Sequence, residues 1–246
     1  MKKYLNPNNY IKYVYKYIKK LLKIRNNKRI NNLNFVEKKI KSIKSVDQLL
    51  DFHFKTYSEL NHINREMFDY ILKYFAGSSL NILETGSAAH GTKSSMLFAN
   101  YVKIFGGKFD TVDVDPEIKN FYNFLDSPIT TFHTHDSVNF IKNLDDEFIE
   151  TLDLIFLDSY DLDIENPEPS QQHGLNEFML LNNKIKKGTI ISIDDTPDNY
   201  DKFSNSKPNN FNFIPGKGKL VLDYIYKNPG LYEILFHDYS VVLIKK

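Results

Sequence analysis

The sequence predicts an α/β protein, in which a doubly wound, mostly parallel seven-stranded sheet ends in an antiparallel hairpin and follows a basic helical extension. Three observations lead to this fold class. From residue 80 onward short apolar runs alternate with helical stretches, five of these runs end at or beside an acidic or polar residue, and positive charge is concentrated in residues 1–45. We expect residues 1–45 to form the extension and residues 46–246 to form one α/β domain.

The extension carries 14 lysine and arginine side chains against one acid, Glu37, whereas the rest of the chain carries 18 basic and 30 acidic side chains. Residues 10–24 place apolar side chains on one helical face with lysines beside it. This pattern predicts that residues 10–25 bind an anionic membrane surface. Docking on the acidic remainder of the chain, or on a partner subunit in a homodimer, is the alternative. A polar loop at 26–34 and helices at 35–45 and 61–75 are expected to follow.

Composition excludes several classes of chemistry. The chain has no cysteine, so disulfides, thiolate nucleophiles and cysteine-ligated zinc are all ruled out. It has no uninterrupted apolar run of about 18 residues and no signal-peptide core, so we expect a cytoplasmic protein, peripheral on the inner face of the membrane if residues 10–25 bind there. The acidic balance after residue 45 argues against a nucleic-acid partner.

The apolar runs predict strands at residues 81–84, 109–113, 130–133, 152–158 and 189–194, and a hairpin at 232–236 and 240–244. In open α/β sheets ligands bind beyond the carboxyl ends of the strands. The polar residues that follow the first five runs are therefore expected to line one cleft.

The first run ends at Glu84 and continues into a turn of small residues, 86–91. Gly86 permits a tight turn, and the small side chains after it allow a ligand to approach the backbone. The order Gly-x4-Gly-Lys-Ser of a phosphate-binding P-loop is absent. Ala88 stands where the middle glycine of a dinucleotide-binding Gly-x-Gly-x-x-Gly turn is expected, which argues against NAD.

The second run ends in an acid, and an acid also follows shortly after the third run. Asp113 closes the second run, and its carboxylate can accept hydrogen bonds from both hydroxyls of a ribose. Asp115, followed by Pro116, is expected to cap the next helix. Asp136 and Ser137 follow the third run, where capping a helix and contacting a ligand are compatible roles.

Taken together, these segments resemble class I S-adenosylmethionine (SAM)-dependent methyltransferases, which are Rossmann-like. The resemblance covers about residues 80–246 and implies SAM as the cofactor. It implies that Glu84 lies near the amino-acid part of SAM, Asp113 near its ribose and Asp136 near the adenine amino group. The cofactor-binding residues implied in this way are Glu84, Gly86, Ser87, Ala88, Gly91, Asp113, Asp136 and Ser137.

Three further acids, Asp158 after the fourth run and Asp194 and Asp195 after the fifth, resemble the acidic cluster of metal-dependent O-methyltransferases of the catechol and macrocin types. The resemblance implies Mg²⁺ bound by these three carboxylates. The catechol type has Asp-Asn where this chain has Asp194-Asp195, and hydrogen bonding to local backbone is the alternative role. His173 is the candidate general base, with a capping or surface role as its alternative, and Asp158 is the second catalytic candidate.

The sequence therefore predicts methyl transfer to a small polar hydroxyl acceptor such as a saccharide. An NAD(P)-dependent oxidoreductase on a Rossmann fold and a non-catalytic, membrane-associated nucleoside-binding protein are the alternatives. Residues 197–219 are predicted to form a loop beside the site, in which Lys217 and Lys219 are solvated or contact an anionic acceptor.

Overall fold

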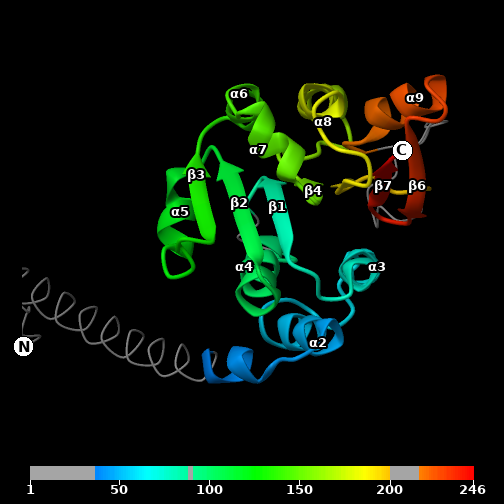
Figure 1. The fold of residues 1–246 in the computed structure, drawn as a ribbon. Coiled ribbons are helices and arrows are strands. Elements are labelled where there is room, and N and C mark those ends of the chain that lie inside the picture. Colours follow the sequence, from blue (N-terminus) through cyan, green and yellow to red (C-terminus); the bar gives the residue numbers. More distant parts are fainter. Residues whose placement is uncertain (1–36, 88–90, 200–215) are drawn as a thin grey trace, which may run out of the picture. The chain divides into compact units, whose positions relative to one another are not determined.

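The structure, a computed structural model, describes residues 37–87, 91–199 and 216–246. Residues 44–246 form one compact unit around a seven-stranded sheet with the order β3-β2-β1-β4-β5-β7-β6 (Figure 1). The first five strands pair in parallel, and β7 pairs antiparallel with both β5 and β6. The strands are β1 (Leu80–Thr85), β2 (Gly107–Asp113), β3 (Thr130–Thr134), β4 (Leu154–Leu157), β5 (Ile190–Ile193), β6 (Tyr232–His237) and β7 (Val241–Lys245). The predicted mostly parallel sheet with a C-terminal hairpin is confirmed.

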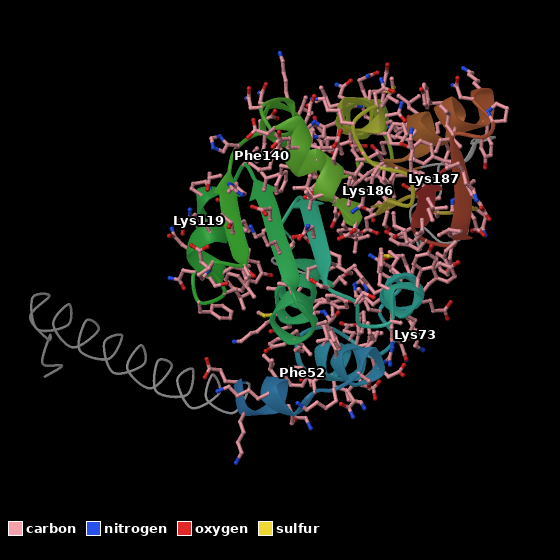
Figure 2. All side chains as sticks on the ribbon, viewed as in Figure 1. Phe52, Lys73, Lys119, Phe140, Lys186 and Lys187 are labelled. Carbon is pink, nitrogen blue, oxygen red and sulfur yellow. The ribbon has the colours of Figure 1, made fainter. Side chains whose placement is uncertain are left out.

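Helices cover both faces of this sheet, as a doubly wound fold requires. One face packs against α6 (Ser137–Lys142), α7 (Asp146–Thr151), α8 (Glu168–Asn182) and α9 (Lys219–Lys227). The opposite face packs against α3 (Arg65–Phe75) and α4 (Ser94–Phe105), with α2 (Val46–Thr56) beside them and α5 (Pro116–Tyr122) against β3. Charged side chains such as Lys73 and Lys119 lie on the exposed sides of α3 and α5 (Figure 2).

The central strand β4 shows why the sheet is buried on both faces. Ile155 and Leu157 belong to the apolar cluster under α8, while Phe156 points the other way and packs against Phe68 and Phe98, with ring centroids 5.4 Å and 5.7 Å apart. A parallel strand covered on both faces has a continuous apolar sequence instead of an alternating one. Each fully buried side chain of this size contributes roughly 1.5–3 kcal/mol to stability.

The helices before the sheet depart from the prediction. The chain is helical at 37–42 and non-helical at 43–45, and α2 then begins, a helix that the sequence analysis did not predict. Ser45 starts it, because its side chain accepts a hydrogen bond from the backbone N–H of Gln48. The helix predicted at 61–75 begins only at Arg65.

The predicted amphipathic helix at 10–24 and the loop at 26–34 lie outside the described residues, as do residues 200–215 of the loop predicted at 197–219. Within the described part of that loop, Lys219 is the first residue of α9 and not part of a loop. None of the helices that the structure describes is both long and apolar enough to cross a bilayer.

Candidate active site

A cavity of about 750 Å³ lies at the carboxyl ends of the parallel strands. This volume falls in the range of small-molecule sites. The strand order reverses between β1 and β4, which is where ligands bind in open α/β sheets. Six of the eight predicted cofactor-binding residues line the cavity: Gly86, Ser87, Gly91, Asp113, Asp136 and Ser137. Of the other two, Glu84 is buried and does not line the cavity, and Ala88 lies outside the described residues.

The turn after β1 is fixed by backbone geometry. Gly86 has φ +81°, and a Cβ at this position would come within 2.4 Å of the Asp158 carbonyl oxygen. The Ser87 backbone N–H donates to Asp113 Oδ2 over 2.9 Å. The small residues of the turn therefore bring its backbone against the ends of β2 and β4 without steric conflict.

Glu84 is fully buried, with 0% exposure. Its Oε2 accepts hydrogen bonds from Ser95 Oγ, at 2.5 Å, and Thr111 Oγ1, at 2.7 Å. Its Oε1 makes no hydrogen bond of standard geometry with the described residues, although the Ser94 hydroxyl is near enough to lower the pKa of this carboxyl. Burial raises the pKa of this carboxyl to about 7, against the lowering effect of the hydroxyl donors.

The acids after β2 and β3 organise the chain locally and also face the cavity. Asp113 Oδ1 accepts from the backbone N–H of Asp115 over 2.9 Å. Asp115 caps α5 with Pro116 in the first turn, and Asp136 caps α6 by accepting from the Asn139 N–H over 2.9 Å. The capping interpretations of Asp115 and Asp136 are confirmed, and both side chains also line the cavity.

His173 lies in α8 at the centre of a hydrogen-bonded group. Its Nε2 is 2.9 Å from Ser137 Oγ and 3.5 Å from Glu177 Oε1. Glu177 is buried and also accepts from Ser159 Oγ over 2.6 Å. The hydrogen bond to the Glu177 carboxylate raises the pKa of His173 above its ordinary value, against the effect of burial.

The three acids of the predicted metal site do come together, and Lys217 lies among them. The Lys217 ammonium donates to Asp158 Oδ1 over 2.7 Å and to the Asp158 carbonyl oxygen over 3.2 Å, and it pairs with Asp195 Oδ2 at 3.2 Å. Burial lowers the pKa of Lys217, but the surrounding carboxylates outweigh it and raise that pKa above its ordinary value. Burial and the charge of Asp194 raise the pKa of Asp158 well above its usual range.

Asp194 is held by neutral donors. Both of its carboxylate oxygens lie 2.9 Å from Asn64 Nδ2, and Oδ1 also accepts from Ser240 Oγ over 2.6 Å. Burial and the neighbouring Asp195 raise the pKa of Asp194 to about 6. Asp195, at φ +44°, accepts from the hydroxyl of Tyr239 over 2.7 Å.

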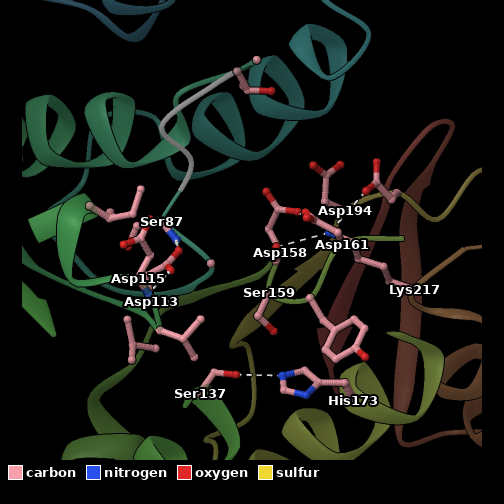
Figure 3. Close-up of a pocket in the computed structure, with 18 of the residues that line it drawn as sticks. Ser87, Asp113, Asp115, Ser137, Asp158, Ser159, Asp161, His173, Asp194 and Lys217 are labelled. Atoms are coloured by element: carbon pink, nitrogen blue, oxygen red, sulfur yellow. Dashed lines mark hydrogen bonds and ion pairs between the residues drawn. The ribbon is translucent and has the colours of Figure 1, made fainter. Parts of the chain in front are cut away.

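The cavity thus has two opposite sides and a third wall between them. Figure 3 shows Ser87, Asp113 and Asp115 on one side and the group of Asp158, Asp194 and Lys217 on the other. The hydrogen-bonded pair of Ser137 and His173 lies along a third wall. The geometry can hold one ligand against the ends of β1 and β2 while a second ligand meets the ends of β4 and β5.

The same arrangement of elements occurs in MycE, a methyltransferase from the mycinamycin biosynthetic pathway that was solved in complex with Mg, SAH and mycinamycin VI. The superposition has a TM-score of 0.56 with 14% sequence identity, and it covers 80% of this chain and 52% of MycE. A second match is the SAH-bound Podospora anserina methyltransferase PaMTH1, with a TM-score of 0.51, 12% identity and coverage of 88% and 95%. The chain has the class I SAM-dependent methyltransferase fold.

This methyltransferase fold is the one that the sequence resemblance implied. The chain spans about half the length of MycE. No protein-family model and no curated protein sequence matches the chain.

The cluster at the ends of β4 and β5 does not fit the predicted Mg²⁺ site. No group of three or more His, Asp and Glu side chains in the described part of the chain could hold a metal ion. Asp158 and Asp195 give oxygens to the Lys217 ammonium, and both oxygens of Asp194 face Asn64. In this structure the three predicted metal ligands, Asp158, Asp194 and Asp195, thus face an ammonium group and neutral donors.

Sequence reasoning missed several residues of this site. Lys217 was interpreted as a solvated loop lysine or an anion contact, yet its side chain is only 5% exposed. His62 and Asn64 also line the cavity, although no motif marks them. Glu177 follows His173 by one helical turn, a spacing that was available in the sequence as a signal.

Proposed function

We propose that this chain is a SAM-dependent methyltransferase that methylates an oxygen of a small polar hydroxyl acceptor such as a saccharide. The observation that carries the proposal is the convergence of the predicted cofactor residues on one cavity, in a fold shared with two SAH-bound methyltransferases. The acceptor class rests on the resemblance of the sequence to O-methyltransferases.

Asp113 is the proposed ribose-binding residue. A carboxylate has about four lone-pair sites, and the backbone N–H groups of Ser87 and Asp115 use two of them. Two remain for the ribose hydroxyls. We assign Asp136 and Ser137 to the adenine side of the cavity, and Gly86, Ser87, Ala88 and Gly91 to the methionine part.

Glu84 acts from beneath the turn. It does not line the cavity, so we assign it a contact through a water with the ammonium group of the cofactor. A cationic ligand above it would in turn favour the charged form of this carboxyl.

When bound, SAM would supply an electrophilic methyl group for the acceptor oxygen, and its sulfur would keep the electron pair of the broken carbon–sulfur bond. His173 takes the proton of the acceptor hydroxyl, and Glu177 stabilises the imidazolium that forms. Asp158 keeps the turn after β4 in place through its bonds to Lys217. The remaining contribution of the protein is to align the two ligands.

A thermal-shift screen with SAM, S-adenosylhomocysteine, NAD⁺ and NADP⁺ tests the cofactor. A ligand at about 100 times its Kd stabilises the folded protein by about 2.7 kcal/mol. The proposal expects a shift with the first two compounds alone. A shift with NAD⁺ or NADP⁺ alone would favour the oxidoreductase alternative, and a SAM shift with no methyl transfer to any of a broad set of hydroxyl compounds would favour the non-catalytic one.

For residues 10–25 we propose binding to an anionic membrane surface, on the basis of the charge pattern alone. Co-sedimentation with vesicles of 30% phosphatidylserine tests it, by comparing the full chain with a variant in which Lys12, Lys16, Lys19 and Lys20 are changed to Gln. Equal partitioning of the two proteins would remove the proposal.

A further inference from the structure

The backbone around Lys217 is fixed to the end of β5. Its N–H donates to the Asp195 carbonyl oxygen over 3.0 Å, and the Gly218 N–H donates to Thr196 Oγ1 over 2.9 Å. Gly216 has φ +105°, and a Cβ there would come within 2.0 Å of the Asp195 carbonyl oxygen. Only glycine allows so close an approach, so the position of the lysine between two glycines is set by the main chain.

The ammonium of Lys217 has all of its hydrogens engaged. Its three contacts are Asp158 Oδ1, the Asp158 carbonyl oxygen and Asp195 Oδ2, at 2.7, 3.2 and 3.2 Å. An ammonium group has three N–H donors, so these contacts account for all of them. This lysine therefore has no N–H left to donate to a methyl acceptor, and its positive charge is paired with the carboxylates.

A divalent cation would need the same oxygens. Mg²⁺ takes carboxylate oxygens at about 2.0–2.1 Å in nearly ideal octahedral geometry. Asp158 and Asp195 could serve it only if the ammonium left, and Lys217 is held in place by its backbone and 5% exposed. The oxygens of Asp194 would also have to give up Asn64 and Ser240.

We propose that Lys217 is the built-in cation of this site, and that its ammonium replaces a divalent metal in the cluster of Asp158, Asp194 and Asp195. The lysine is a positioning residue: it ties the turn after β4 to the turn after β5, on the cavity side opposite Asp113. Its relevance to methyl transfer rests on the proposed function, whereas its competition with a metal does not.

Titration of the full chain with Mn²⁺, followed by electron paramagnetic resonance of the free ion, tests the inference in the absence of SAM. Wild type is expected to show no saturable site that depends on the cluster. Lys217→Met keeps the length of the side chain and removes its charge, so it is expected to bind Mn²⁺ at least roughly tenfold more tightly. Adding Asp195→Asn to that variant is expected to abolish the gain.

Two results would overturn the inference: a Mn²⁺ site in wild type that Asp195→Asn removes, or a folded Lys217→Met protein that gains no site. If Lys217→Met does not fold, Mn²⁺ binding by wild type is compared with Mn²⁺ binding by Asp195→Asn. Equal binding by these two proteins would support the inference, because a cluster whose metal is replaced by the ammonium has no Mn²⁺ site for Asp195→Asn to remove. If SAM did not raise the melting temperature, the proposed function would be contradicted, and the results of the Mn²⁺ titrations would still test the inference.

Discussion

Changing Glu84 to Gln is expected to alter how stability depends on pH. Burial raises the pKa of Glu84 from 4.5 to about 7, so the folded protein holds this proton more tightly than the unfolded chain does. Stability from this group is therefore fully present below about pH 4.5 and is lost as the pH rises to about 7. A shift of this size corresponds to about 3 kcal/mol.

The assay is thermal unfolding of wild type and Glu84→Gln, without ligand, at about pH 5 and pH 8.5. The amide has its own constant cost, because its N–H₂ group replaces a carboxyl oxygen in a fully buried position, and this cost cancels between the two pH values. Relative to wild type, the variant should gain roughly 6–12 °C in Tm between the lower and the higher pH. Glu66→Gln, on the exposed side of α3, is the matched control.

A difference in Tm between Glu84→Gln and wild type that is the same at both pH values would refute the reasoning. It would mean that the carboxyl is hydrated or paired in solution, and that burial does not control its charge. An equal response of Glu66→Gln would point to a global effect of pH instead of one local to Glu84.

Three further predictions concern the site. Asp113→Ala should weaken S-adenosylhomocysteine binding in calorimetry by roughly tenfold or more, since hydrogen bonds to a charged group contribute about 1.5–3 kcal/mol each. Asp110→Asn, on the same strand but outside the cavity, should bind as wild type does. Equal affinities of Asp113→Ala and wild type would exclude the ribose role. Gly86→Ala should lower the free energy of unfolding in urea by more than about 2 kcal/mol, because its Cβ meets the backbone. Gly230 also has a positive φ but no neighbour within 4 Å, so Gly230→Ala should lower it by about 1 kcal/mol. Similar losses in the two variants would show that the turn at Gly86 relaxes. His173→Asn should retain S-adenosylhomocysteine affinity and slow methyl transfer by about 100-fold or more. In wild type the rate should fall as the pH drops through a pKa above the ordinary value of histidine, and Glu177→Gln should move this inflection to lower pH. An unmoved inflection would assign the titration to another group.

The sheet could be predicted because its signals are local. The central strand β4 is a continuous apolar run, since the sheet is covered on both faces. Asp113 ends one predicted strand, and Asp136 follows another by three residues. Capping adds a second local signal, because a carboxylate at a helix start bonds to a backbone N–H two or three residues later. Both kinds of evidence are contained within a few residues.

The rest of the site depends on pairs that are far apart in the sequence. Lys217 meets Asp158 across 59 residues, and Asn64 meets Asp194 across 130. In a single sequence, a lysine between two glycines in a polar stretch looks the same whether it is solvated or buried. The metal prediction could not take Lys217 into account for this reason: three acids at strand ends indicate a cation, and they do not tell whether that cation is a metal or an ammonium.

The helix α2 was missed because its boundary is a single capping residue. Ser45 starts a helix directly after a short non-helical stretch, so a second helix begins along the chain where the sequence pattern predicted one helix ending. The apolar residues of α2 are interrupted by the buried His53, which weakens the periodic signal.

The most direct test of the account is a crystal structure of the chain grown with S-adenosylhomocysteine. The account predicts the ribose hydroxyls within hydrogen-bond distance of the Asp113 carboxylate, with the sulfur facing the wall of the cavity that holds His173. A nucleoside bound away from the ends of β1 and β2, or one whose ribose does not touch Asp113, would contradict it.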